Sequence, residues 1–320
     1  MNPPEGLIKY TEWPVPEISG NNELLMRVRV AALKHVDRSR ASGKHYSSGT
    51  VNAAQPTVIG GDGVGLLADG TRVYAIGVSG MVAEQAIIDK DRMVILPDNL
   101  DDATASALPN AVIGSAMALR FKAKIQSGDT VLINGATGVT GRIAVQIAKH
   151  YGAKRVIATG RNPDALQELP DLGADEIVSV QQEDEEFVAQ IQSLHSQTPV
   201  DIIIDYLWGH TSELLLMAFK GKGSFTHHIR FVSVGSLAGD ILKLSAMSLR
   251  SVDLQLTGSG LGSWSRQDVG KLFSEILPEM FQLAADGKLK IETVKVPLAE
   301  IESVYDTAIT TGKRLVIETM

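Results

Sequence analysis

A glycine-rich segment in the middle of the chain carries the residues whose spacing points most directly to chemistry. A strand-like run, residues 130–134, leads into GATGVTG at 135–141, and apolar residues then recur every three or four positions, as on one helix face. Small residues at 136, 138 and 141 form a variant of the fingerprint that binds a dinucleotide pyrophosphate. The alternative is a helix-capping turn whose glycines serve only backbone conformation. The order strand, turn, helix and second strand favours dinucleotide binding.

The residues after the second strand concern the choice between two nicotinamide cofactors. That strand, 155–159, ends about 20 residues beyond Gly141, where such folds hold the adenosine ribose. A site for NADH places an acid there, but this chain reads Gly160-Arg161-Asn162. A guanidinium matches the charge and shape of a 2′-phosphate, so Arg161 predicts a preference for NADPH. The other interpretation is an exposed arginine at a strand end.

The elements that must position these residues divide the chain into two parts. From Leu24 to about Leu96 the chain holds short β-rich runs (LLMRVRVAAL, PTVIG, TRVYAIG, RMVILP) with many glycines, which predicts a small barrel with bulges. DDATASALPNAVIGSAMALRF then indicates one helix or two short ones. From Thr130 onward, strand-like runs alternate with expected helices at 139–151, 163–171, 184–195 and 209–219, which predicts a doubly wound parallel sheet. The late runs KIETVKVPL and RLVIETM are expected to return to the first part.

Composition limits the class of protein. A length of 320 residues predicts about two domains. A net charge of -7 argues against nucleic acid and anionic membranes as partners, and no apolar run approaches the ~18 residues that span a bilayer. We therefore expect a soluble cytoplasmic protein. The chain has 0 cysteines, which excludes disulfides, thiolate nucleophiles and cysteine-bound zinc.

This arrangement resembles the medium-chain dehydrogenase/reductase superfamily, specifically its zinc-free quinone oxidoreductase (zeta-crystallin-like) branch. The resemblance rests on AALKHVDRSRASGKHY, PTVIGGDGVG, LPNAVIGSAMAL, LINGATGVTGRIAVQIAKHYGAKRVIATG, LGADEIV, VDIIIDYLWG and FVSVGSLAG. It implies an α/β protein with a GroES-like β-barrel catalytic domain (1–110 and 276–320) and a Rossmann NADPH-binding domain (111–275), with the reaction in the cleft between them. It also implies a homodimer. The Tyr-x-x-x-Lys pair of short-chain dehydrogenases does not occur.

The absence of zinc ligands limits the reactions that this chain is expected to catalyse. Zinc-dependent members carry Cys near Lys34 and His near Gly61, and neither residue here ligates zinc; the histidines also lack His-x-x-x-His spacing, so no metal is expected. Without a Lewis acid, a conjugated acceptor suits hydride transfer better, because its negative charge delocalises onto an enolate or quinol oxygen. The expected activity is NADPH-dependent reduction of a quinone or other α,β-unsaturated carbonyl. The alternative is an NADPH-binding structural or regulatory protein with little turnover.

Resemblance also supplies the candidate catalytic residues Tyr46, Lys34 and Asp37. Tyr46 is either a proton donor or an aromatic at the pocket rim. Lys34 either stabilises an oxyanion or pairs with Asp37, and we favour the structural role. Asp62, in a glycine-rich stretch, is expected to bond a turn.

Candidate cofactor contacts lie on the loop and at the strand ends. By resemblance, Asn110 and Ser115 contact the nicotinamide or the substrate; the alternative is that they cap a helix. Residues 205–209 are expected along the adenosine or ribose, and 233–235 near the nicotinamide. The full set expected to bind NADPH is Asn110, Ser115, Gly135, Ala136, Thr137, Gly138, Val139, Thr140, Gly141, Gly160, Arg161, Asn162, Tyr206, Ser233, Val234 and Gly235.

Overall fold

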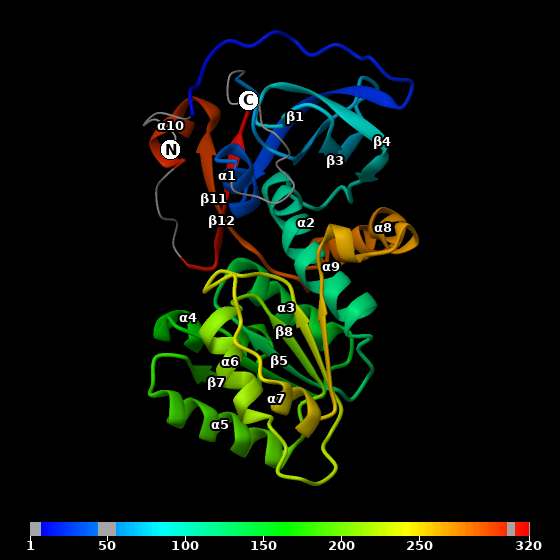
Figure 1. Ribbon diagram of the computed structural model, residues 1–320. Coiled ribbons are helices and arrows are strands. Elements are labelled where there is room, and N and C mark those ends of the chain that lie inside the picture. The colour runs from blue at the N-terminus through cyan, green and yellow to red at the C-terminus, as the bar shows by residue number, and fades with distance from the viewer. Residues whose placement is uncertain (1–7, 44–55, 306–310, 320) are drawn as a thin grey trace. The chain divides into compact units, whose positions relative to one another are not determined.

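The computed structural model describes residues 8–43, 56–305 and 311–319, and the chain forms two compact units (Figure 1). Unit 1 comprises Met1–Asn110 with Phe273–Met320, and unit 2 comprises Ala111–Leu272. The α/β class is confirmed: unit 1 contains a small antiparallel barrel and unit 2 a parallel six-stranded sheet. Within the described ranges, no helix is long and apolar enough to cross a membrane.

The barrel of unit 1 closes because one long strand pairs along both of its halves. Strand β1 pairs with β4 over its first half and with β2 and β12 over its second half, while β2, β3 and β4 pair in sequence. The late strand β11 runs parallel to β12, so both late strands join this sheet as expected. The strands are β1 (Glu23–Leu33), β2 (Asp62–Leu66), β3 (Arg72–Gly77), β4 (Gln85–Ile95), β11 (Glu292–Pro297) and β12 (Lys313–Glu318).

Glycine and alternating apolar residues explain this packing. Met26 and Val28 of β1 point into the core while Arg27 between them is exposed, the period of two that a half-buried strand needs. A Cβ on Gly65 would lie 2.2 Å from the carbonyl oxygen of Arg27, so the close pairing of β1 and β2 requires glycine. The prediction of a strand at PTVIG is wrong, because the strand in this region begins at Asp62.

Unit 2 is built on a sheet with strand order β10-β9-β8-β5-β6-β7, and every neighbouring pair is parallel. The strand order reverses direction at β5, so the crevice between β5 and β8 is the topological switch point where such sheets bind ligands. The strands are β5 (Thr130–Asn134), β6 (Arg155–Gly160), β7 (Glu176–Ser179), β8 (Ile202–Asp205), β9 (Ile229–Ser233) and β10 (Leu254–Gly258).

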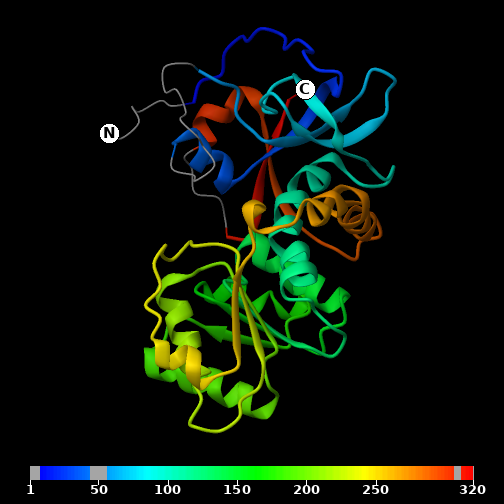
Figure 2. The same cartoon turned by 45° about the vertical axis from the view of Figure 1, so that its right-hand side comes forward.

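Helices lie on both sides of this sheet (Figure 2). Helix α3 packs on β5 and β6, and α4 on β6 and β7. Phe187 and Ile191 of α5 and Leu215 of α6 share one apolar core with Leu132 and Phe231 of the strands. The helices of unit 2 are α3 (Val139–His150), α4 (Pro163–Gln167), α5 (Asp184–Gln197), α6 (Gly209–Ala218), α7 (Ala246–Ser251) and α8 (Arg266–Lys271).

The remaining helices include the region predicted as one helix or two. It is a single helix, α2 (Asp102–Met117), that continues as a π-helical turn over Ala118–Lys122. Unit 1 also holds α1 (His35–Ala41), α9 (Leu277–Ala285) and α10 (Ile301–Val304). A second π-helical turn spans Leu272–Ile276, and 3-10 turns span Pro170–Leu172, Leu261–Ser263 and Leu298–Glu300.

Candidate functional site

The glycine loop joins the central strand β5 to helix α3. Gly135 adopts the left-handed conformation, with φ of 88°, which a side chain would disfavour. A Cβ on Gly141 would lie 2.5 Å from the carbonyl oxygen of Gly135, so this glycine lets the helix approach the turn. A Cβ on Gly138 would meet nothing nearer than 3.8 Å, again the Gly135 oxygen. The space beside Gly138 is therefore open to a ligand.

Helix α3 begins with free hydrogen-bond donors. Gly138 is its N-cap and has no side chain to bond the backbone N–H groups of the first turn. These groups and the helix dipole form a positive pole that suits a phosphate. The loop is held in place from the neighbouring strand, because Ala136 N donates to the carbonyl oxygen of Thr159 at 2.7 Å. The loop therefore presents a phosphate cradle at the carboxyl edge of the sheet.

The end of β6 supplies one charged group beside this cradle. Gly160 is buried, and a Cβ there would lie 2.4 Å from Thr137 Cγ2, so glycine is needed for the loop and strand to pack. Arg161 is exposed and makes none of the ion pairs seen among the described residues. Asn162 Oδ1 accepts from Ala165 N at 3.0 Å and caps α4. Arg161 is thus the side chain at this position that remains available to a ligand.

The ends of β8 and β9 are tied to each other by the backbone. Val234 N and Gly235 N both donate to the carbonyl oxygen of Asp205, at 2.8 and 3.2 Å. Ser233, the last residue of β9, is half-buried. The Tyr206 hydroxyl donates to the carbonyl oxygen of Gly114 at 2.8 Å, and burial raises the pKa of Tyr206, so the phenol stays neutral. The structure therefore brings 206 and 233–235 together at the carboxyl edge that carries the glycine loop.

Two predicted cofactor contacts on α2 have partners of their own. Ser115 is 0% exposed, and its hydroxyl donates to the carbonyl oxygen of Ala111 at 2.6 Å, as a serine inside a helix often does. Asn110 Oδ1 accepts from Arg314 Nη2 at 3.3 Å. Neither side chain caps a helix end.

Unit 1 holds a buried cluster of charged groups around Lys34. Its ammonium pairs with Asp37 Oδ2 at 3.4 Å and bonds Asp62 Oδ1, and the Lys34 side chain is only 3% exposed. Burial alone would lower the pKa of Lys34, but the charges of Asp62 and Asp37 outweigh it and raise that pKa. Asp62 Oδ2 also accepts from the Tyr74 hydroxyl at 2.7 Å. The turn predicted for Asp62 is wrong: it begins a buried strand and compensates a buried cation.

The same cluster fixes the start of α1. Asp37 Oδ2 accepts from Lys34 N at 2.9 Å, so this carboxylate serves both the backbone and the ammonium. Burial lowers the pKa of the nearby Arg314 to about 10, against the opposing effect of Asp37 and Asp62. Tyr46, the third predicted catalytic residue, lies outside the described residues.

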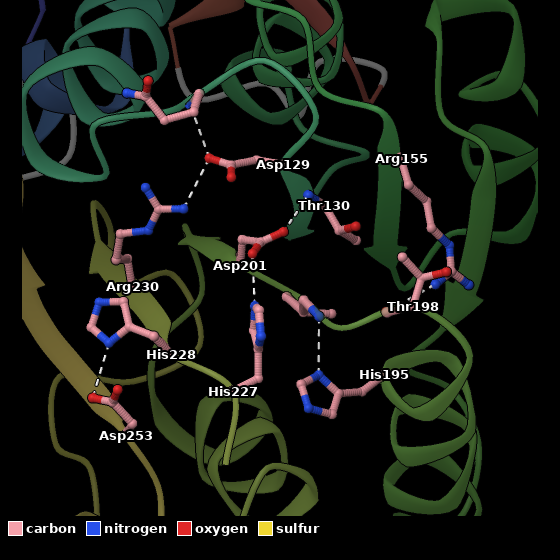
Figure 3. Close-up of polar contacts among 12 residues, drawn as sticks. Asp129, Thr130, Arg155, His195, Thr198, Asp201, His227, His228, Arg230 and Asp253 are labelled. Atoms are coloured by element: carbon pink, nitrogen blue, oxygen red, sulfur yellow. Dashed lines mark hydrogen bonds and ion pairs between the residues drawn. The ribbon is translucent and has the colours of Figure 1, made fainter. Parts of the chain in front are cut away.

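Three histidines, His195, His227 and His228, bond carboxylates or backbone groups at the opposite, amino-terminal edge of the unit 2 sheet (Figure 3). His227 Nε2 bonds Asp201 Oδ1 at 2.7 Å, and His228 Nδ1 bonds Asp253 Oδ1 at 2.9 Å. His195 Nδ1 accepts from Val200 N at 3.0 Å. In the part of the chain that the structure describes, no three His, Asp or Glu side chains gather as a metal site would require.

Three polar side chains meet at the carboxyl edge, and only Asp205 lies in a stretch that the sequence predicted to flank the cofactor. Asn134, Thr159 and Asp205 each stand at or near the end of a buried apolar strand, and each is 0% exposed. A hydrogen bond of 2.8 Å joins Asn134 to Asp205, and one of 2.7 Å joins Thr159 to Asn134. The sequence does contain a signal for this group, because each of the apolar runs TVLIN, RVIAT and DIIID ends in a polar residue.

Known proteins match this chain over most of its length. A family model described as zinc-binding dehydrogenase matches residues 139–278. A probable NADPH-dependent quinone reductase of Emericella nidulans is 27% identical over 96% of this chain and 95% of its own. A mitochondrial enoyl-[acyl-carrier-protein] reductase of Arabidopsis thaliana is 26% identical over 96% and 82%. The quinone oxidoreductase of Thermus thermophilus, also solved with NADPH, superposes with a TM-score of 0.75 at 24% identity over 96% and 95%.

The barrel, the parallel sheet with its glycine loop and these matches show the fold of the medium-chain dehydrogenase/reductase superfamily. In sequence the chain is similar to quinone reductases and quinone oxidoreductases.

Proposed function

We propose that this chain is an NADPH-dependent oxidoreductase that transfers a hydride to a quinone or another α,β-unsaturated carbonyl without zinc. The observation that carries the proposal is the pairing of an open phosphate cradle at Gly138 with an exposed, unengaged Arg161 at the end of β6. The cradle suits a pyrophosphate and the guanidinium suits a 2′-phosphate. Bound NADPH supplies the hydride.

The chain's own residues bind and orient in this proposal. The N–H groups of Val139, Thr140 and Gly141 hold the pyrophosphate, and Ala136 and Thr137 shape the cradle beside it. Residues 206 and 233–235 flank the same crevice from β8 and β9, which supports their predicted place near the ribose and nicotinamide. The side chains of Asn110 and Ser115 are already bonded to Arg314 and to the Ala111 carbonyl, so each would bind the cofactor through its backbone or after giving up that bond.

The acceptor class follows from the groups available to receive charge. Lys34 is already paired with two carboxylates, which supports its structural role with Asp37 at the start of α1 over a role in stabilising an oxyanion. A conjugated acceptor needs no strong cation, because its charge spreads to an enolate or quinol oxygen. Tyr46 or water would then protonate that oxygen. Two relatives are named as a quinone reductase and an enoyl reductase, and both names describe the reduction of a conjugated system.

Cofactor consumption by the purified chain tests this function. NADPH oxidation would be followed with benzoquinones, naphthoquinones, conjugated enals and enones, alongside NADH and acceptor-free controls. We expect turnover with NADPH and one acceptor class. NADPH binding without oxidation in the presence of any acceptor would instead support a binding protein with little turnover, and equal use of NADH would contradict the cofactor assignment.

A further inference from the structure

A fully buried carboxylate lies at the switch point of the unit 2 sheet. Asp205 ends β8 and is 0% exposed, so it cannot itself touch a ligand. Oδ1 of Asp205 accepts from Asn134 Nδ2 at 2.8 Å, and Oδ2 accepts from Ser212 Oγ at 2.6 Å. The backbone N–H of Leu207 also donates to Oδ1, at 3.0 Å. Burial raises the pKa of Asp205, but every group that faces this carboxylate donates, which favours its ionised form.

The carboxylate sets the direction of a chain of hydrogen bonds that crosses the sheet. Because Asn134 gives its Nδ2 donor to Asp205, its Oδ1 is turned toward β6 and accepts from Thr159 Oγ1 at 2.7 Å. The Thr159 hydroxyl has then used its proton and accepts from Gly135 N at 3.3 Å. The chain thus runs from β8 over β5 to β6 and ends on the first amide of the glycine loop.

Asp205 also holds the strained turn that follows β8. Trp208 and Gly209 have φ of 56° and 60°, and a non-glycine residue in that region is uncommon. The N–H of Trp208 donates to both oxygens of Asp205 at 3.2 Å, which offsets the strain of this conformation. One carboxylate therefore fixes the two backbone segments on either side of the crevice between β5 and β8.

We propose that Asp205 is a positioning residue for the dinucleotide: through Asn134 and Thr159 it sets the conformation of the glycine loop that receives the pyrophosphate. The proposal rests on the function proposed above. Asn134 and Thr159 carry the chain of hydrogen bonds to Gly135, here called the relay, and Asp205 is the fixed acceptor that sets its direction. In Asp205→Asn an amide NH2 replaces one acceptor oxygen among neighbours that all donate, so the Asn134 amide is no longer held in one orientation and the ordering of Gly135 is weakened.

The test compares two aspartates at opposite ends of the same strand. Asp205→Asn changes the carboxyl end of β8, whereas Asp201→Asn changes the residue before β8, which bonds Thr130 N at 2.7 Å and His227. Dissociation constants for NADPH and for adenosine 2′-phosphate, which has no pyrophosphate, would be measured by calorimetric titration well below each variant's melting temperature. We expect Asp205→Asn to weaken NADPH by at least roughly tenfold, about 1.4 kcal/mol, and adenosine 2′-phosphate by less than about twofold. Asp201→Asn should lower the melting temperature and leave both constants within about twofold.

A second variant covers the case in which Asp205→Asn does not fold. Thr159→Val keeps the shape and strand preference of the residue and removes only its hydroxyl, so we expect a folded protein with NADPH binding weakened by at least roughly threefold.

The outcomes separate this proposal from the proposed function. Equal weakening of both ligands by Asp205→Asn, equal weakening of NADPH by Asp201→Asn, or unchanged NADPH binding in Thr159→Val would overturn the positioning role while leaving the function in place. A wild-type chain that binds neither ligand would overturn both.

Discussion

Arg161 is the residue on which the proposed cofactor preference depends. Its guanidinium is exposed and its neighbours Gly160 and Asn162 are committed to packing and to capping α4. Arg161→Ala should raise the KM for NADPH by roughly 10- to 100-fold, because a charge-assisted contact with a phosphate is lost. The KM for NADH should stay within about twofold. Steady-state kinetics with both cofactors check this, with Arg250→Ala as an exposed control; equal effects on the two cofactors would count against the assignment.

Substitution of Lys34 tests whether the buried charged cluster of unit 1 stabilises the fold. Lys34→Met removes the ammonium that pairs with both Asp37 and Asp62 and leaves Arg314 as a nearby cation, which should cost about 3–5 kcal/mol of unfolding free energy. Lys34→Met/Asp62→Asn should recover part of that loss, because one buried charge is removed with its partner. Urea denaturation measures both variants. A Lys34→Met protein of wild-type stability with impaired turnover would favour the oxyanion role instead.

His195 links local structure to pH. Its ring is half-buried against Phe219, and burial together with the charge of His227 lowers the pKa of His195. Because the folded-state pKa lies below the ordinary value of 6.5, the unfolded chain binds this proton more readily, and stability falls as the pH drops below 6.5. His195→Gln should make the unfolding free energy less dependent on pH between about 5 and 7. Denaturation at several pH values checks this; an unchanged slope would contradict it.

At the scale of elements, two glycines of the loop have separable roles. Gly138→Ala adds a Cβ with nothing nearer than 3.8 Å, so the unfolding free energy should fall by less than about 1 kcal/mol. NADPH binding should weaken by roughly tenfold or more, because the methyl group enters the space proposed for the pyrophosphate. Gly141→Ala places its Cβ 2.5 Å from a backbone oxygen and should cost about 2–4 kcal/mol of stability. Thermal unfolding and NADPH titration distinguish the two. Similar behaviour of both variants would contradict this division.

Elements with strong periodicity were predictable from the sequence. The run TVLIN, the loop and the helix starting at 139 lie as predicted, because burial on both sheet faces leaves an almost purely apolar strand. PTVIG is also apolar but forms no strand, and the carbonyl oxygens of Ile59 and Gly60 accept from Val82 N and Met81 N instead. The local pattern does not reveal this. The bonds of Asp62 to Lys34 and Tyr74 join three separate elements, and the relay from Asp205 to Gly135 joins three strands. Such pairings depend on tertiary packing, so residue spacing alone does not contain them.

At the scale of the whole molecule, β10 is an edge strand of the unit 2 sheet, which supports the predicted homodimer. Ser259 N donates to Ser233 O of β9, so by alternation the amides of Gly258 and Leu256 face away from the sheet. Light scattering should give twice the chain mass of 34.3 kDa. In hydrogen exchange, the amides of Leu256 and Gly258 should be protected in the dimer and exposed on dilution. A monomer, or fast exchange at these amides in a dimer, would contradict pairing through β10.

In unit 1 the second half of β1 pairs with β12, although most of the chain lies between these two strands in sequence. All of unit 2 lies between those strands in sequence. During synthesis, therefore, the ribosome releases every residue of the parallel sheet before β12 can pair with β1. The early strands must wait with an unpaired edge while unit 2 folds, and a stop codon or protease cut before β12 leaves that edge open. Covering this edge therefore depends on residues that are synthesised only after all of unit 2.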